Sequence, residues 1–275
     1  MFVIDVPNFN LNHIYDSGQV PRWICLNRSD EKAKYVIPHK DKALKIEQQR
    51  NKYDWSVHRL IMSCSEEDFY GIWFTYFDLK TDYLKESNRA RKLGKKFKVV
   101  ANRGNGIHII NQDQFEAYIL SRIIEKAGYA KAKAAMNHIA ETCGVEHVQS
   151  MKEAGKVVWY EWPTPEMILE NSHKLKKMGN VNEWLECICM TIIERGFEFI
   201  IENSNSKLFK LLGLHDVNVF PLTEIEQTLA KNFGENPEEF EDWYLSDFEN
   251  KGLVYLYILH HIKNPPREKM LYGVN

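Results

Sequence analysis

The stretch "DSGQVPRWICL" (residues 16–26) places Ser17, Gly18 and Gln19 directly before a strand-like segment. Gly18 permits a backbone angle that a residue with a side chain would resist. Short apolar segments bounded by turn residues follow the same pattern nearby, at residues 2–6, 22–26, 35–37 and 60–64. These segments predict strands of an antiparallel sheet. The stretch therefore predicts a turn that leads into an N-terminal sheet.

Composition and length indicate an ordinary globular chain. Its 275 residues are 44% hydrophobic and 27% charged, with a formal net charge of −2. The longest apolar runs, such as residues 254–259, are far too short to cross a bilayer. The start, MFVIDVPNF, lacks the basic and apolar regions of a secretory signal, so we expect a cytoplasmic protein of prokaryotic or phage origin. Five cysteines without a CxxC pair predict neither a structural metal site nor a disulfide framework.

Helical patterns follow the sheet. Ser65 is followed by three acidic residues, and Asp113 has Glu116 three places on, which predicts a capped helix start at each position. The aromatic residues after position 68 fall on one helical face and are interpreted as core. Further helices are predicted at 131–142, 184–195, 203–212, 222–232 and 237–261, and another opens at the Pro-Thr-Pro of residues 163–165. Sheet first and helices after predict an α+β protein.

Charge is distributed unevenly along the chain. Residues 85–103 contain eight lysines and arginines against the single acid Glu86, whereas residues 235–249 contain seven acidic residues and no basic one. A basic segment can meet phosphate, but a solvated, lysine-rich connector is the interpretation that the charges alone favour.

Five segments in order resemble the 8-oxoguanine DNA glycosylase family of the helix-hairpin-helix glycosylases. "SGQVPRW" (17–23) is similar to the family's SGQ-x-F-R-W signature, with Pro21 where phenylalanine is usual. The others are residues 65–83, "GIHIINQDQFEAYILSRII" (106–124), "WPTPEMI" (162–168) and "KGLVYLYILHHIKN" (251–264). The resemblance implies an N-terminal antiparallel sheet domain with a basic connector at 1–105. A mostly helical glycosylase-like domain with a degenerate helix-hairpin-helix is implied at 106–275.

The resemblance also implies a base pocket and a DNA wedge. Gly18 would bring its backbone carbonyl against an extruded base, with Gln19 beside it. Tyr255 and Leu259 stand where the family has a base-reading glutamine and a stacking phenylalanine, so recognition of 8-oxoguanine in the family's manner is not expected. Tyr255 either binds a different, bulkier base or packs between helices. The turn that fills the space left by the base corresponds to residues 126–129, which include the three wedge candidates Lys126, Gly128 and Tyr129.

Both catalytic positions of the family are altered. Breaking a glycosidic bond requires a nucleophile and a carboxylate that stabilises the developing charge. "VFPLTEI" places Thr223 where the family has its aspartate, with Glu224 one step later, and a one-residue shift turns a helical side chain by about 100°. An exposed acid in a first helical turn is the favoured role of Glu224.

The lysine-bearing hairpin of the family is also changed. "IENSNSKLFKLLGL" contains no G-x-G, and an ungapped count places Ser204 at the lysine position. A shortened hairpin would place Lys207 there instead, and an exposed lysine is the alternative. Loss of the hairpin removes backbone amides that grip phosphate, which weakens the expectation of tight duplex binding.

Three hypotheses follow for function. The first is an enzyme on an extruded modified base, either a divergent glycosylase using Lys207 and Glu224 or a phage-type transferase on modified pyrimidines. The second is a catalytically inactive module that binds DNA or another partner. The third is an N-glycosylase of free modified nucleosides or nucleotides. DNA with a modified or damaged base is the expected partner, with a free nucleotide as the alternative. We expect a monomer without a cofactor or a membrane partner.

Overall fold

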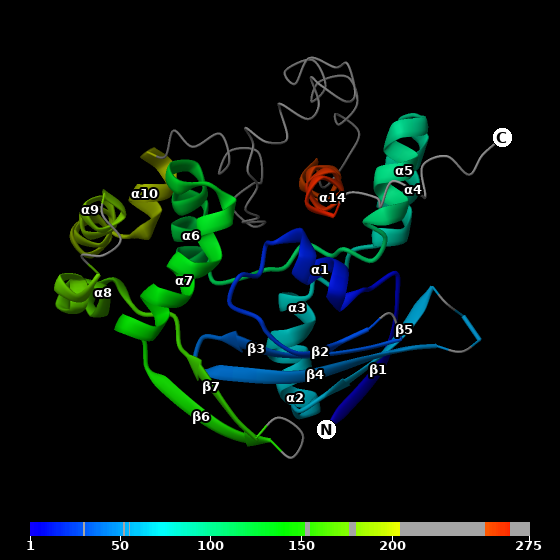
Figure 1. Cartoon of the computed structure of the whole chain (residues 1–275), viewed down its shortest axis with the longest axis horizontal. Helices are drawn as coiled ribbons and strands as arrows, with labels where there is room; N and C mark the ends of the chain where they lie inside the picture. The colour runs from blue at the N-terminus through cyan, green and yellow to red at the C-terminus, as the bar shows by residue number, and fades with distance from the viewer. Residues whose placement is uncertain are drawn as a thin grey trace.

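The computed structural model describes residues 1–29, 31–51, 53–54, 56–151, 155–175, 180–203 and 251–264. A five-stranded antiparallel sheet forms one side of the molecule, and helices lie above it and beside it (Figure 1). The strand order is β1-β5-β4-β3-β2, with bounds Phe2–Pro7 (β1), Ile24–Arg28 (β2), Lys32–His39 (β3), Lys42–Arg50 (β4) and Val57–Met62 (β5). The predicted α+β class and N-terminal antiparallel sheet are confirmed.

Two elements of the sheet region escaped the sequence-based prediction. Strand β4 has the sequence KALKIEQQR, in which polar residues outnumber apolar ones, yet Leu44, Ile46 and Gln48 alternate as its buried residues. Helix α1 (Leu11–Ser17) lies directly before the Gly18 turn. Its N-cap is Asn10, whose side-chain oxygen accepts hydrogen bonds from the backbone amides of Asn12 and His13.

The first predicted capped helix forms as expected at its start. The Ser65 hydroxyl accepts a hydrogen bond from the Asp68 amide at 3.0 Å, and α2 (Glu66–Asp68) continues through a π-helical turn, Phe69–Trp73, into α3 (Phe74–Tyr76). This irregular helix covers one face of the sheet (Figure 1). Phe69, Trp73 and Tyr76 are buried in the cluster that packs on the sheet, which confirms that they are core, whereas Tyr70 is exposed.

The basic segment of residues 85–103 is not a connector. It forms two helices, α4 (Tyr83–Lys92) and α5 (Lys95–Arg103), that pack against each other. Phe97, Val100 and Ala101 on α5 are buried, and they belong to the same hydrophobic cluster as the helical region. The charges conceal this apolar stripe in the sequence, because only three of nine positions in α5 carry it.

The remaining described elements form the helical region. They are α6 (Gln114–Ala127), α7 (Tyr129–Cys143), β6 (Glu146–Met151), β7 (Gly155–Tyr160), α8 (Pro165–Asn171), a 3₁₀ turn (Ser172–Lys174), α9 (Asn180–Arg195), α10 (Phe197–Asn203) and α14 (Lys251–Lys263). The cap predicted at Asp113 is confirmed, α7 ends at the C-cap residue Gly144, and Thr164 caps α8. The antiparallel β6-β7 hairpin was not predicted.

Two large hydrophobic clusters divide the described chain. One lies between the sheet and α1 to α3, and the other combines α4 and α5 with the helical region. Ile110 belongs to the sheet cluster, whereas Ile107 and Ile109 belong to the helical one, so the chain crosses between the clusters at this segment. The boundary at residue 105 stays a prediction, although the buried side chains place α4 and α5 with the helices.

The described residues were compared with the requirements of a membrane span, a metal site and a disulfide. No helix among them is long and apolar enough to cross a membrane. No group of three or more histidine, cysteine and acidic residues in the described ranges is arranged to hold a metal ion. All five cysteines are free thiols.

Two buried histidines and one half-buried histidine predict that the protein loses stability as the pH falls from 6.5 toward 4. Burial, as the largest cause, lowers the pKa of His39, His58 and His108 to about 4. Below pH 6.5 the unfolded chain therefore takes up protons that the folded chain does not, and unfolding is favoured. Each such histidine contributes a slope of up to about 1.4 kcal/mol per pH unit in the free energy of unfolding.

Urea unfolding at a series of pH values measures this slope. His39→Gln should reduce the slope of the unfolding free energy against pH by up to about 1.4 kcal/mol per pH unit, the contribution of one proton. His173→Gln, at an exposed position, should leave the slope unchanged. A flat stability profile between pH 6.5 and 4 in the unmodified chain would contradict the prediction.

Candidate functional site

The site begins at the turn between α1 and β2. Gly18 has φ 87° and ψ 7°, in the left-handed region, and its amide donates to the Tyr15 carbonyl at 3.2 Å. The conformation is the one that glycine adopts at little cost, as the sequence predicted. Gly18 is buried, and α1, which it ends, packs against α14. The turn is thereby held at the junction between the sheet and the last described helix.

Gln19 fixes the turn to the segment that enters the helical region. Its side chain is fully buried, and its amide nitrogen donates to the His108 carbonyl at 2.8 Å and to the Ser17 hydroxyl at 3.1 Å. Its side-chain oxygen accepts from the Ile110 amide at 2.8 Å. In the described structure this side chain serves as a bridge within the protein. Its predicted place in the base pocket stays a prediction.

Arg22 makes the second connection, through a buried ion pair. Its guanidinium donates to both carboxylate oxygens of Glu116, at 2.6 and 2.9 Å, and to the Tyr160 carbonyl at 2.8 Å. It also lies 5.5 Å from the ring centroid of Trp162. The two charged side chains are 5% and 6% exposed. The pair joins the turn after α1 to α6 and to the end of β7.

Sequence reasoning missed this ion pair. It assigned Glu116 to the helix start, and the amide of Glu116 does donate to Asp113, but the carboxylate binds Arg22 instead of completing a capping box. The available signal was that both residues lie within segments of the glycosylase resemblance, "SGQVPRW" and "NQDQFE".

Trp23 anchors the turn to the sheet side. Its indole is 3% exposed, and the indole N–H donates to the Tyr76 hydroxyl at 2.9 Å. Tyr76 lies on α3 and belongs to the sheet cluster, whereas Arg22 contacts Trp162, which packs against the helical cluster. Residues 18–23 therefore contact both hydrophobic clusters. Gly18 therefore stands on a segment that is fixed from two sides.

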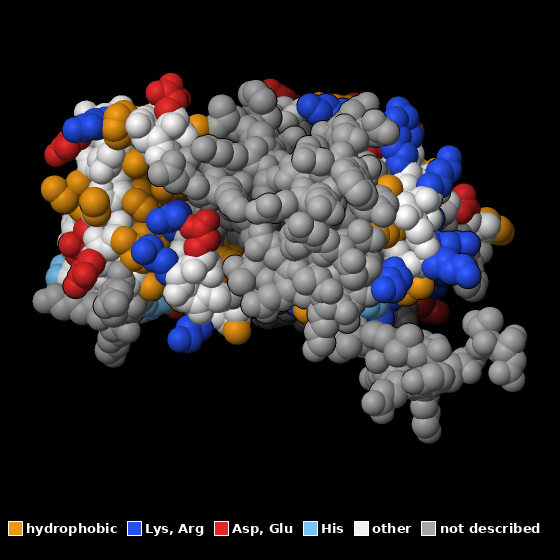
Figure 2. Space-filling model, turned by 90° about the horizontal axis from the view of Figure 1, so that it is seen from above, with side chains coloured by type: hydrophobic (Ala, Val, Ile, Leu, Met, Phe, Trp, Pro, Cys, Tyr) orange, Lys and Arg blue, Asp and Glu red, His pale blue; other side chains and the backbone are white. Residues whose placement is uncertain are grey.

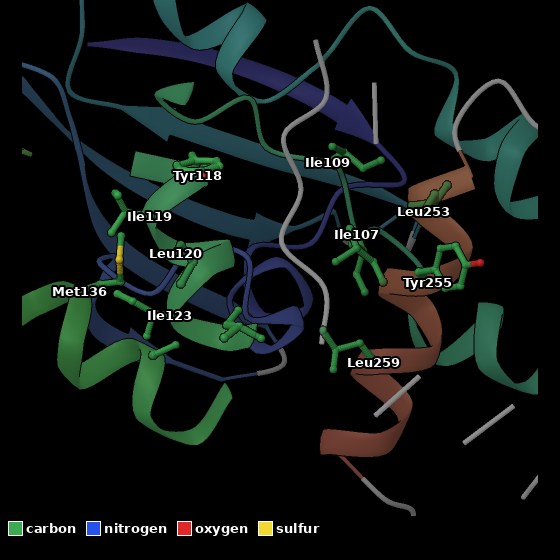
Figure 3. Packing of buried hydrophobic residues seen from close by; sticks show 14 of the residues in the cluster. Ile107, Ile109, Tyr118, Ile119, Leu120, Ile123, Met136, Leu253, Tyr255 and Leu259 are labelled. Carbon is green, nitrogen blue, oxygen red and sulfur yellow. The ribbon is translucent and has the colours of Figure 1, made fainter. Parts of the chain in front are cut away.

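The candidate pocket residues on α14 are buried. Tyr255 is 5% exposed and Leu259 is fully buried, and both belong to the helical cluster. Figure 3 shows them projecting from α14, near Ile107 and Ile109 of the segment that crosses between the clusters. This segment is the one that Gln19 holds. Gly18 and α14 are thus brought to one junction through α1 and residues 107–110.

The candidate wedge forms a tight turn between two helices. Lys126 lies in the last turn of α6, and Gly128 separates α6 from α7 with φ 79°. A side chain at Gly128 would meet open space, so the backbone angle alone is what favours glycine there. Tyr129 begins α7. Lys126 and Gly128 are exposed, and the role of the turn as a wedge stays a prediction.

The predicted catalytic residues lie elsewhere in the sequence. Lys207, Thr223 and Glu224, like the Ser204 alternative, fall outside the described residues. Their roles stay predictions.

A basic surface flanks α14. Lysine and arginine side chains gather over α4 and α5 on one edge of the molecule as seen from above (Figure 2). Lys85, Lys92, Lys95 and Lys98 are exposed there. Helix α5 packs against α14, so this surface adjoins the junction described above.

Comparisons with known proteins agree with this architecture. Residues 1–118 of the 275 match the sequence profile of the N-terminal domain of 8-oxoguanine DNA glycosylase. A search of curated protein sequences gives no match.

Solved structures of similar fold extend the likeness over nearly the whole chain. The apo form of Clostridium acetobutylicum 8-oxoguanine glycosylase/lyase superposes with a TM-score of 0.69 at 20% identity, covering 94% of this chain and 96% of that one. The same protein with double-stranded DNA containing cytosine opposite 8-oxoG gives 0.69 at 22% identity, covering 96% and 98%. The 3-methyladenine DNA-glycosylase of Archaeoglobus fulgidus gives 0.63 at 16% identity, covering 97% and 100%. The chain therefore has an 8-oxoguanine-glycosylase-like scaffold.

The buried ion pair predicts a large loss of stability when it is broken. Arg22→Met leaves the Glu116 carboxylate buried without its partner and should lower the free energy of unfolding by about 3–5 kcal/mol. Replacing both residues, Arg22→Met with Glu116→Leu, should restore much of that loss, because no uncompensated charge remains. Urea unfolding measures all three chains.

A matched control is the exposed pair of Arg59 and Asp5, whose side chains are 55% and 42% exposed. Arg59→Met should cost less than about 1 kcal/mol. If Arg22→Met lowers the free energy of unfolding no more than Arg59→Met does, the Arg22–Glu116 ion pair does not hold the sheet and the helical region together.

Proposed function

We propose that this chain, on its 8-oxoguanine-glycosylase-like scaffold, binds DNA and processes a modified base that is extruded from the stack. The base would be received at the junction between the Gly18 turn and α14. The observation that carries the proposal is that turn, whose left-handed Gly18 is held by buried hydrogen bonds from Gln19 and by the Arg22 ion pair. A binding site needs such a fixed backbone, because positions must be held within fractions of an ångström.

The base is inferred to differ from 8-oxoguanine. At the two α14 positions where the family reads and stacks the base, this chain has Tyr255 and Leu259. At the reading position a phenol offers different hydrogen bonds from a glutamine amide, and at the stacking position leucine offers less stacking surface than phenylalanine. The specificity of this pocket would therefore rest on shape and on contacts that the family's own base does not use.

The chemistry would also be altered. Lys207 is the candidate nucleophile and Glu224 the candidate carboxylate, with Thr223 unable to carry charge at the aspartate position. An amine attacking C1′ would displace the base and form a Schiff base with the opened sugar. A transferase acting on a modified pyrimidine, an inactive reader of modified DNA and an N-glycosylase of free nucleotides are the competing functions.

The basic surface of α4 and α5 favours DNA over a free nucleoside as the main ligand. Several exposed lysines beside α14 would each offer a contact to a phosphate of the DNA backbone (Figure 2). A protein acting on a free nucleoside has no need of such a surface. Because the glycine-rich hairpin is missing from the sequence, these helices would supply part of the backbone grip that it gives in the family.

Covalent trapping tests the chemistry. With a lyase mechanism, borohydride should reduce the Schiff base to a stable protein–DNA complex that disappears in Lys207→Ala, because that variant lacks the amine. Denaturing gel electrophoresis detects the complex. Lys210→Ala, a lysine three places away, is the control and should still form it. If no lesion-containing oligonucleotide gives a complex, the lyase version is excluded and the reader or the transferase is favoured.

Salt dependence tests the DNA surface. The triple variant Lys92→Ala, Lys95→Ala and Lys98→Ala should bind duplex DNA more weakly and with a shallower dependence on salt. Each lost phosphate contact removes about 0.9 from the slope of log affinity against log salt. Fluorescence anisotropy at several salt concentrations measures the slope.

The control carries the same change of charge elsewhere on the surface. Lys40→Ala, Lys80→Ala and Lys156→Ala replace three exposed lysines outside α4 and α5 and should leave the slope unchanged. Equal slopes for the two triple variants would remove α4 and α5 from the DNA interface. No binding of the unmodified chain to any DNA would contradict the proposed function itself.

A further inference from the structure

A second site lies apart from the residues of the base-binding proposal. A polar cavity of about 630 Å³ opens where the ends of β1, β2, β4 and β5 meet α1, α5 and α14. Its lining includes neither Gly18 nor Tyr255 nor Leu259, although His260 and Asn264, at the far end of α14, contribute to it. We propose that this cavity binds a mononucleotide. Its volume is within the range of about 300–1,000 Å³ that is typical of small-molecule sites.

Three buried side chains in the cavity wall, those of Asn8, His58 and His260, have polar atoms without a partner among the described residues, which for His58 is Nδ1. Asn8 is 4% exposed, and within the described structure neither its amide nitrogen nor its amide oxygen makes a hydrogen bond. His260 is 5% exposed, and its Nδ1 is likewise unpaired. Buried polar groups in native proteins are nearly always paired, since leaving them unpaired is costly. Three such side chains in one wall therefore indicate a place that a ligand completes.

The surrounding polar groups hold this wall in place. The Asn10 side chain caps α1, and Asn12 donates to the Ser29 carbonyl at 2.9 Å while accepting from the Tyr35 hydroxyl at 2.8 Å. His13 Nδ1 lies 2.7 Å from the Asn105 carbonyl oxygen. The cavity is thus built from side chains that already bind each other, and a ligand would meet a wall that needs little ordering.

The unpaired groups match the parts of a nucleotide. The Asn8 amide has one donor and one acceptor face side by side, which is the arrangement that pairs with the edge of a nucleobase. The rings of His13 and His260 pack against each other with their centroids 5.0 Å apart, and the half-buried His13 ring is the one on which a base would stack. Because burial lowers the pKa of His260 to about 3, its ring is neutral near pH 7 and can both donate and accept.

The charges of the lining favour an anionic group on the ligand. Two guanidinium groups, those of Arg28 and Arg50, line the cavity together with one carboxylate, Asp16. Arg28 binds Asp16 through both of its terminal nitrogens, so these two charges balance. Guanidinium groups bind phosphate through paired hydrogen bonds, so a lining with two of them and one carboxylate suits an anionic group. A nucleobase edge, a stacking ring and a phosphate together define a mononucleotide.

Calorimetric titration of the full chain tests the inference without DNA. The probes are the four ribonucleoside monophosphates and their four deoxy counterparts, with the free nucleosides and inorganic phosphate as separate titrations. At least one mononucleotide should bind more tightly than its nucleoside and than phosphate alone. Asn8→Gly should weaken that binding by about tenfold or more, because it removes the amide and keeps a residue that tolerates the φ of 50° at this position.

A second cavity variant and a control variant outside the cavity distinguish loss of a ligand contact from a general effect of substitution. His260→Leu should also weaken binding, whereas Asn203→Gly, which removes an exposed amide from α10, should not. Both cavity variants should keep the affinity of the chain for DNA, so a failure here is separate from a failure of the proposed DNA function.

Three outcomes would overturn the inference. They are the absence of binding by all eight mononucleotides at millimolar concentration, phosphate binding as tightly as every nucleotide, and unchanged nucleotide affinity in both Asn8→Gly and His260→Leu.

Discussion

The fold depends on a buried ion pair between Arg22 and Glu116. The guanidinium comes from the turn that follows α1, and the carboxylate comes from the first turn of α6, 94 residues later. With both side chains about one-twentieth exposed, neither charge is tolerable without the other, so arrangements of the sheet and the helical region that separate the two charges are disfavoured. Gln19 acts in the same direction through its bonds to residues 108 and 110. These contacts of Arg22 and Gln19 fix the position of the Gly18 turn.

This constraint separates the architecture of the site from its chemistry. The contacts that position Gly18 involve Gln19, Arg22 and Trp23, none of which has a role in bond cleavage in our proposal. The proposed catalytic groups stand in a different part of the sequence, at residues 207–224. A chain can therefore change its nucleophile and its carboxylate while the receiving turn keeps its geometry. For the same reason a retained scaffold is weak support for a retained reaction, and the reaction needs its own test.

Sequence reasoning succeeded where the structural cause is local. The Ser65 and Asp113 caps and the left-handed Gly18 follow from each residue's own hydrogen bonds and backbone freedom. It failed where distant contacts decide. Strand β4 is mostly polar and is a strand because both neighbouring strands pair with it. The partner of the Glu116 carboxylate was missed because it is remote in the sequence, and α5 was missed because its apolar stripe lies among lysines.

Helix α14 connects the two proposed sites. Tyr255 and Leu259 on this helix belong to the base-binding proposal, and His260, the next residue after Leu259, lines the polar cavity. The helix packs on α1 and on α5, so it contacts the element that ends at Gly18 and one of the two basic helices. A ligand that pairs with His260 restrains the same helix that would wall an extruded base. Binding at the two sites would then be linked, and the linkage must be equal in both directions: whatever a nucleotide does to base affinity, the base does to nucleotide affinity.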